Sequence, residues 1–313
     1  MGAGGGFDVY SGIPLYLALK EAGKEVILGN YAFSFLHSTI CEEICPHAFR
    51  VTPKSRSQGY FPEHTLAEWL ADQEHPSEVI AFQGTGVIPM KMAMEHIIQM
   101  YQIDTLILVD GGTDSMMMGH EAGLGTPVED MTSIVAGGEL ELGRKYLVSI
   151  GFGVDHFHQV AHAQVLESIA RQMEEGGFKG VLGFAPNEKP VQSFLDLVDR
   201  SNGTHANRQS IVANSIADAF RGKYGDVHAT SRTRGSRLYI NPLMSLYWTF
   251  ELNAISKNIL YRDWIRQTVT KEQVLKKIQA CRMTIGHKGW EDIPLKLLNC
   301  KFVYLLGMIE KSG

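Results

Sequence analysis

The chain has 313 residues, of which 44% are hydrophobic and 20% charged, a mixture that excludes extensive disorder and allows a large apolar core. Its formal net charge of -5 disfavours a general nucleic-acid binder, because such proteins need concentrated Lys and Arg. No apolar run reaches the roughly 18 residues of a membrane span. The start MGAGGGFDVYSG also lacks the basic and apolar regions of a signal peptide, so we expect a soluble, cytoplasmic protein without a membrane partner.

The first two thirds of the chain alternate short apolar runs with helical patterns, which predicts βαβ units. The predicted strands are 25–29, 79–84, 105–110, 145–151 and 181–184. The predicted helices are 13–22, 62–71, 87–101 and 157–174, each with apolar residues at three- and four-residue spacing. Right-handed crossovers between parallel strands place helices on both faces of a sheet. The sequence therefore predicts an α/β fold with a Rossmann-like parallel sheet.

The C-terminal third is predicted to be more helical. Its predicted helices are 191–200, 210–221, 242–257 and 271–283, and 237–240 is the one segment that resembles a central strand. No linker marks a boundary, so we expect residues 1–313 to form a single domain. The alternative is that 189–313 forms a helical cap or subdomain.

Four glycine-rich loops follow expected strand ends, at 2–8, 84–86, 110–115 and 151–155. Glycine allows backbone N–H groups to approach an anion closely, and the carboxyl ends of parallel strands share one sheet edge. We therefore expect a small anionic ligand, bound by phosphate or carboxylate groups. The expected ligand-binding residues are Gly4, Gly5, Gly6, Asp8, Gly84, Thr85, Gly86, Gly111, Gly112, Thr113 and Ser115. For any single loop, the alternative is a tight turn without a ligand.

The aspartates of these loops are candidates for chemistry. Asp110, Asp114 and Asp155 together could hold a divalent cation such as Mg²⁺, Mn²⁺ or Zn²⁺, or they could act as acid or base. The alternative for Asp8 and Asp155 is that they cap the helices that follow. No acidic residue ends the second strand, which stops at Asn30, so an NAD-type oxidoreductase is disfavoured.

Two histidines and a basic segment add further candidates. His158 and His162 lie one turn apart on the predicted helix, where both could reach a metal or move a proton; the alternative is a structural role near the helix start. Arg232, Arg234 and Arg237 could bind ligand oxygens in a bidentate way, although such a run is often a solvated turn. Asn241 follows them and could also enter the site.

Two further segments are weighed against structural roles. Glu121, Glu129 and Asp130 flank a loop at 123–127 that is long enough to act as a lid, but the alternative is helix capping. Four cysteines, Cys41, Cys45, Cys281 and Cys300, fit neither a zinc ribbon nor a disulfide framework, so we expect reduced thiols.

A set of ordered motifs resembles a known family. The motifs are GAGGGFD, VDGGTDS, EAGLGTPVEDM, GFGVD, HAQVLE and SRTRGSRLYINPLMSLYW, and together they resemble the prokaryotic domain of unknown function eleven fifty-two over nearly the whole chain. The resemblance supplies no activity. It implies an α/β chain with a shared site at Gly4, Gly5, Gly6, Asp8, Asp110, Gly111, Gly112, Asp114, Asp155, Arg232 and Arg234. It also leads us to expect a hydrophobic strand before the first glycine loop, and hence a truncated start.

The first functional hypothesis is an enzyme that acts on a small phosphorylated or nucleotide-like metabolite, by metal-assisted hydrolysis or group transfer. No nucleophile elbow, Walker lysine or kinase signature is present, so covalent serine catalysis and P-loop chemistry are not supported. The alternative is a non-catalytic nucleotide or metabolite sensor. The sequence does not decide between a monomer and a homo-oligomer.

Overall fold

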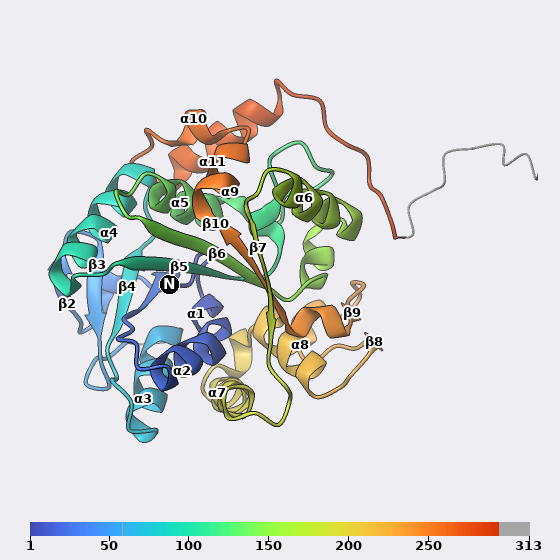
Figure 1. The fold of residues 1–313 in the computed structure, drawn as a ribbon. Helices are drawn as coiled ribbons and strands as arrows, with labels where there is room; N and C mark the ends of the chain where they lie inside the picture. The colour runs from blue at the N-terminus through green and yellow to red at the C-terminus, as the bar shows by residue number, and fades with distance from the viewer. Residues whose placement is uncertain (58, 294–313) are drawn as a thin grey trace, which may run out of the picture.

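A computed structural model describes residues 1–57 and 59–293, which form a mixed α/β fold (Figure 1). The strands are β1 Leu28–Ala32, β2 Glu42–Cys45, β3 Ala48–Val51, β4 Val79–Gln83, β5 Thr105–Gly111, β6 Arg144–Ile150, β7 Phe178–Gly183, β8 Gly225–Asp226, β9 Tyr239–Ile240 and β10 Leu246–Glu251. The α-helices are α1 Asp8–Ser11, α2 Ile13–Glu21, α3 Pro62–Asp72, α4 Val87–Tyr101, α5 Pro127–Gly138, α6 His162–Glu174, α7 Lys189–Thr204, α8 Ile211–Phe220, α9 Leu252–Asn258, α10 Arg262–Ile265 and α11 Lys271–Arg282. The 3₁₀ turns are η1 Leu36–Ser38, η2 Asp114–Met116, η3 Val154–His158, η4 Ala206–Arg208, η5 Ser231–Thr233 and η6 Pro242–Ser245.

Residues 1–3 join two four-stranded sheets, which have the orders β1-β4-β3-β2 and β5-β6-β10-β7. Gly2 N donates to Gly29 O at 2.9 Å, and Ala3 N donates to Val109 O at 2.8 Å, so this short segment pairs with β1 on one side and β5 on the other. The chain leaves the sheet at Ala3. The glycine loop that follows is therefore held between the carboxyl ends of β1 and β5.

The expected parallel sheet is not confirmed, because the strand directions are mixed. β1 pairs with β4 in parallel, and β5 pairs with β6 in parallel. However, β3 runs antiparallel to β4, and β10 runs antiparallel to both β6 and β7. The first departure comes from a β2–β3 hairpin, whose turn holds His47 at a φ of 70°.

Helices cover both faces of the sheet, as expected from the crossovers (Figure 1). Alternating residues of β4 show how the two cores divide: Val79 and Ala81 belong to the core that also contains residues of α1, α2, α3, α7 and α8, whereas Ile80 and Phe82 belong to the core that contains residues of α4, α5, α6, α9 and α11. All four of these side chains are buried. Burial of apolar surface stabilises a fold by about 25 cal/mol per Å², and both faces of the sheet bury such surface. The strand ends and the loops that follow them are therefore held from both sides.

The segment predicted as a helix over 242–257 is instead η6, β10 and α9. The sequence LYWTFE of β10 combines aromatic and β-branched residues, which fit a pleated surface. Its backbone pairs with β6 and β7. Pairing in the sheet therefore determines the conformation of this segment, although its apolar residues have helical spacing.

The segment predicted as a helix over 157–174 also differs at its start. The chain forms η3 up to His158, and Gln159 then takes a left-handed φ of 67°, so α6 begins only at His162. His158 and His162 therefore do not lie on one helix, and the expectation that they share a helical face is wrong.

The segment predicted as a central strand over 237–240 contributes only β9, which pairs with β8 in a separate two-stranded sheet. By contrast, β10 places part of the 189–313 segment inside the central sheet. The end of that segment lies outside the described residues, as does Cys300, while Cys41, Cys45 and Cys281 are free thiols. Within the described part of the chain, no helix has the length and apolar character that a membrane crossing requires.

Candidate functional site

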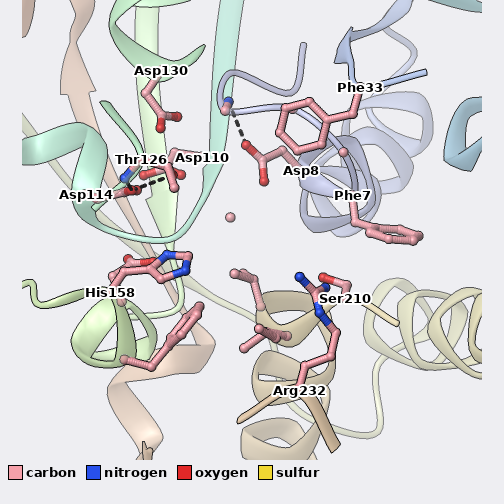
Figure 2. Close-up of a pocket in the computed structure, with 18 of the residues that line it drawn as sticks. Phe7, Asp8, Phe33, Asp110, Asp114, Thr126, Asp130, His158, Ser210 and Arg232 are labelled. Carbon is pink, nitrogen blue, oxygen red and sulfur yellow. Dashed lines mark hydrogen bonds between the residues drawn. The ribbon is translucent and has the colours of Figure 1, made fainter. Parts of the chain in front are cut away.

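A cavity of about 470 Å³ lies where the loops after residues 1–3, β1, β5 and β6 meet. Its lining residues are Gly4, Gly5, Gly6, Phe7, Asp8, Phe33, Tyr60, Asp110, Gly111, Asp114, Thr126, Asp130, Asp155, Phe157, His158, Arg208, Ser210, Ile211, Val212 and Arg232. Figure 2 shows the carboxylates of Asp8, Asp110, Asp114 and Asp130 around one space, with Arg232 across from them.

The first glycine loop is held at both of its ends. Asp8 Oδ2 accepts a hydrogen bond from Gly4 N at 2.7 Å, which ties the start of α1 back to the loop (Figure 2). Beneath the loop, Asn30 Nδ2 donates to Gly6 O at 2.8 Å and to Glu63 Oε1 at 2.7 Å. Asn30 and Glu63 are both fully buried, so this pair fixes the loop from inside the core.

Asp110 lies near the end of β5, and Asp155 lies on η3, which follows the neighbouring strand β6. Asp110 Oδ2 accepts the hydroxyl hydrogen bond of Ser115, and Asp155 Oδ2 accepts from Thr113 N at 2.6 Å. A Cβ at Gly112 would lie 2.8 Å from Asp155 Oδ2, so this close approach requires glycine. The loop after β5 thus uses its own donors to hold both carboxylates at the cavity.

Asp114 is oriented by the start of α5. Its Oδ2 accepts two hydrogen bonds from Thr126, from the backbone N at 2.8 Å and from Oγ1 at 2.9 Å (Figure 2). Thr126 directly precedes α5 and lines the cavity itself. The loop at 123–127, weighed as a lid from the sequence, therefore forms part of the wall and is bonded to it.

Asp130 was weighed in the sequence as a residue that flanks the 123–127 loop, with helix capping as the alternative. It lies in the first turn of α5, is 1% exposed, and turns toward the other carboxylates in Figure 2. Its Oδ1 has no hydrogen-bond partner among the described residues. A Cβ at Gly4 would lie 2.4 Å from this oxygen, so only glycine fits beneath it.

Burial and mutual repulsion both act on the five aspartates. Burial raises the pKa of Asp8 to about 8, and the charges of Asp114 and Asp155 add to the rise. Burial likewise raises the pKa values of Asp110, Asp130 and Asp155 well above the usual range for Asp, and the charge of Asp114 raises all three further. The cluster therefore favours either bound protons or a compensating cation.

The basic side of the cavity is formed by Arg208 and Arg232. Arg232 Nη1 donates to Gln209 O at 2.8 Å, which ties η5 to the segment that leads into α8. His158 lies between the two sides (Figure 2). Burial lowers the pKa of His158 and Arg232 lowers it further, while Asp114 opposes them, so the surroundings favour the neutral imidazole.

Aromatic side chains form a third wall. Phe7 and Tyr60 pack edge to face, with ring centroids 5.4 Å apart, and Phe33 is 51% exposed at the rim. Lys271 of α11 lies beside this wall: its Nζ is 5.5 Å from the centroid of the Phe33 ring and pairs with the carboxylate of Glu129. The cavity thus combines an acidic side, a basic side and an apolar wall.

The second glycine loop does not line the cavity, although Gly84, Thr85 and Gly86 were expected to bind ligand. Another part of the chain already fills this position: Gly86 N donates to Val269 O at 2.9 Å, and Val87 N donates to Thr268 Oγ1 at 3.1 Å. The donors at the start of α4 are therefore used by the protein itself.

Several other expected residues support the site from outside its lining. Gly112, Thr113 and Ser115 hold or accommodate carboxylates, as described above. Asn241 Nδ2 donates to Phe152 O and Tyr239 O, both at 3.1 Å, so it stabilises the chain near η6.

Three basic candidates also lie outside the cavity lining, namely His162, Arg234 and Arg237. His162 Nε2 lies 3.3 Å from Gly153 O, and its ring packs against Phe152 and His156. Both arginines are exposed to solvent. Of the three arginines expected from the sequence, Arg232 is the one that reaches the cavity.

Ten lining residues were not among the sequence candidates for binding or catalysis: Phe7, Phe33, Tyr60, Thr126, Asp130, Phe157, Arg208, Ser210, Ile211 and Val212. Asp130 and Thr126 could have been found from the sequence through the glycine-rich loop at 123–127, because Thr126 lies in this loop and Asp130 flanks it. Ser210 Oγ caps α8 by accepting a hydrogen bond from Ala213 N at 3.0 Å. A serine before a helix predicts such a cap, but it does not indicate that the start of the helix lines a cavity.

The carboxylates best placed for a metal ion are not the set expected from the sequence. Asp8, Asp110 and Asp130 each offer an oxygen within 4.8 Å of the others. The expected trio of Asp110, Asp114 and Asp155 does not meet that condition among the residues that the structure describes. Asp114 and Asp155 instead direct an oxygen at the donors of Thr126 and Thr113.

The fold and the cavity together define a mixed α/β protein with an acidic pocket at the strand ends. Residues 1–285 match the family described as "Protein of unknown function (DUF1152)", and the chain belongs to this family. The resemblance carried by the sequence motifs is thereby confirmed. No curated protein and no solved structure matches the chain.

Proposed function

We propose that the protein is an enzyme that acts on a small phosphorylated, nucleotide-like metabolite by hydrolysis or group transfer. The observation that carries this proposal is the pairing, in one cavity, of a buried carboxylate cluster with the start of α8 and two arginines. Separately, each side has a structural explanation. Facing each other across a polar space, they suit a phosphoryl group that is held at one side and attacked at the other.

The basic side supports phosphate binding. Ser210, Ile211 and Val212 bring the first turn of α8 to the cavity, where backbone N–H groups and the helix dipole favour an anion. Arg232 and Arg208 add guanidinium groups, which bind phosphate oxygens in pairs. This side would hold the anionic end of the substrate.

The acidic side supports the chemistry. Its five carboxylates outnumber the two arginines, so an anionic substrate needs additional positive charge nearby. A bound divalent cation would supply that charge and would polarise a phosphoryl oxygen. The neutral imidazole of His158, at the edge of this cluster, would accept the proton of the attacking water or hydroxyl as the bond from phosphorus to the leaving group breaks.

The apolar wall supports a substrate that carries a ring. Phe33, Phe7 and Tyr60 present aromatic surface beside the glycine loop, and half of the Phe33 side chain is open to solvent. Planar rings stack well on such surfaces. The wall therefore favours a nucleotide-like metabolite over a simple phosphosugar.

A turnover screen tests the proposal. Nucleotides and phosphosugars would be incubated with the protein, with and without Mg²⁺, Mn²⁺ or Zn²⁺, and products followed by mass spectrometry. We expect turnover of at least one nucleotide. His158→Gln should lower kcat by about 10²-fold or more, the usual range for loss of a general base, whereas His162→Gln, outside the cavity, is the matched control.

The alternative of a non-catalytic sensor predicts a different result. Saturable nucleotide binding without product, under every metal condition, would overturn the enzyme proposal and favour a sensor. Equal loss of turnover in the His158→Gln and His162→Gln variants would also contradict the proposed role of His158.

A further inference from the structure

We infer that Asp8, Asp110 and Asp130 form a binding site for one divalent cation. The inference deepens the proposed function and rests on it for its biological use, but the site can be tested without any substrate. Each of the three residues offers an oxygen within 4.8 Å of the others, and they come from three separate elements, α1, β5 and α5. Convergence of three elements on one point distinguishes this group from a chance run of acidic residues along the chain.

Asp130 supplies the independent observation. Its side chain is 1% exposed and turns into the cluster (Figure 2), and its Oδ1 has no hydrogen-bond partner among the described residues. A buried polar atom without a partner is costly, and most such atoms in folded proteins are paired. A cation beside Asp130 Oδ1 would remove that cost, because a carboxylate oxygen is a preferred ligand of hard cations.

Gly4 shows that space is kept for these oxygens. A Cβ on Gly4 would lie 2.4 Å from Asp130 Oδ1 and 2.8 Å from Asp8 Oδ2, so any side chain there would enter the cluster. Gly4 N also donates to Asp8 Oδ2, which leaves Asp8 Oδ1 without a hydrogen bond from Gly4. The glycine loop therefore orients one ligand and leaves room for another.

Asp114 and Asp155 are not part of the group whose oxygens lie within 4.8 Å of one another. Asp114 Oδ2 accepts two hydrogen bonds from Thr126, and Asp155 Oδ2 accepts one from Thr113 N. Loop donors also bond Asp8 and Asp110, so the convergence of their oxygens with that of Asp130 is what distinguishes the proposed ligands. The three proposed ligands are all carboxylates. An all-oxygen set favours Mg²⁺ or Mn²⁺ over Zn²⁺, which is bound most often by nitrogen and sulfur.

The test uses Mn²⁺ alone with the full chain and no substrate. Binding would be followed by isothermal calorimetry and by the loss of the free Mn²⁺ electron paramagnetic resonance signal. We expect saturable binding of one ion per chain. Asp130→Asn, which keeps the shape but removes a charged ligand, should weaken the affinity by about tenfold or more.

Asp218→Asn is the matched control. Asp218 is as buried as Asp130, at 1% exposed, but it lies on α8 away from the cavity lining and pairs with Lys223. Its variant should bind Mn²⁺ with the affinity of the parent protein. If Asp130→Asn fails to fold, Gly4→Ala serves instead, because its added methyl group occupies the same space.

Two results would overturn the site: no saturable Mn²⁺ binding at concentrations up to about 10 mM, or equal affinities of the parent, Asp130→Asn and Gly4→Ala proteins. Failure of the site and failure of the proposed function can be told apart. Mn²⁺ binding that depends on Asp130, without turnover of any nucleotide, would support the cation site and contradict the proposed enzymatic function. Turnover that persists in EDTA, without Mn²⁺ binding, would support the enzymatic function and contradict the cation site.

Discussion

At the scale of single residues, the basic segment around 232–237 shows how neighbours in sequence can have different surroundings. Both Arg232 and Arg234 are exposed, but only Arg232 of this pair lines the cavity. We predict that Arg232→Gln weakens the binding of inorganic pyrophosphate by about tenfold or more, since a hydrogen bond to a charged group contributes roughly 1.5–3 kcal/mol. Arg234→Gln should leave the affinity within about twofold. Calorimetric titration of both variants measures the difference, and equal losses would contradict the assignment.

Glu63 provides a second test at this scale, through pH. Burial raises its pKa from 4.5 to about 7, and the hydrogen bond from Asn30 only partly offsets the rise. A pKa raised in the folded state costs stability as the pH rises from about 4.5 to about 7. We predict that Glu63→Gln, which carries no charge, is more stable than the parent at pH 8 by up to ~3 kcal/mol but not at pH 4.5.

Urea denaturation at the two pH values measures this effect on the free energy of unfolding. Glu174→Gln, an exposed glutamate at the end of α6, is the control that should leave the difference between the two pH values unchanged. A Glu63→Gln variant that stays less stable than the parent at both pH values would show that Glu63 is charged and fully compensated in the fold.

Residue types and loop positions in the sequence predicted most of the aspartates of the site, but not all of them. Asp8, Asp110, Asp114 and Asp155 were all expected and all line the cavity, because a carboxylate beside a glycine turn at a strand end has few other places to lie. Asp130 was not predicted as a site residue, and helix capping was its alternative role, since an acid in the first turn of a helix is favoured by the helix dipole whether or not a site is near. Only tertiary structure separates these roles.

At the scale of elements, the loop before α5 has a glycine whose backbone conformation and close approach to Asp114 both exclude a side chain. Gly125 has a φ of +64°, and a Cβ there would lie 2.3 Å from Asp114 Oδ2. We predict that Gly125→Ala destabilises the protein by about 1–3 kcal/mol and weakens pyrophosphate binding, because Asp114 must move.

Gly143→Ala is the control for this prediction, since no atom lies within 4 Å of its Cβ position. It should change the free energy of unfolding by less than about 0.5 kcal/mol. Thermal denaturation and calorimetry of both variants test the pair. Unchanged stability and binding in Gly125→Ala would show that the loop can rearrange freely.

The elements themselves were predictable where local signals agreed. Helix α4 matches its predicted bounds of 87–101, and β4 follows its apolar run, because pattern and propensity point the same way there. β10 was mispredicted as helix because short aromatic runs fit either conformation until pairing with β6 and β7 decides. Gly84 to Gly86 has the chemistry of a binding loop, but Thr268 and Val269 occupy the position that a ligand would take.

At the scale of the whole molecule, β10 determines how the chain should unfold. It comes from the C-terminal part of the described residues, yet it lies between β6 and β7 in the central sheet. We predict that the amides of β10 and β5 exchange with deuterium through the same global opening, because neither sheet core can form without both segments. Hydrogen exchange followed by mass spectrometry on peptides 246–251 and 105–111 measures this. Much faster exchange in β10 alone would indicate a C-terminal unit that unfolds by itself.

Lys271 connects α11, the last helix of the described residues in chain order, with the surroundings of the cavity, since it pairs with Glu129, the neighbour of Asp130, and lies over the ring of Phe33. One ammonium group thus lies over a ring of the aromatic wall and pairs with a carboxylate next in sequence to the acidic cluster. We expect a ligand that moves Phe33 or the start of α5 to shift α11 as well, through these two contacts. A fluorescent or spin label placed on the solvent side of that helix would therefore report when the pocket fills, without occupying any of the space in which the chemistry takes place.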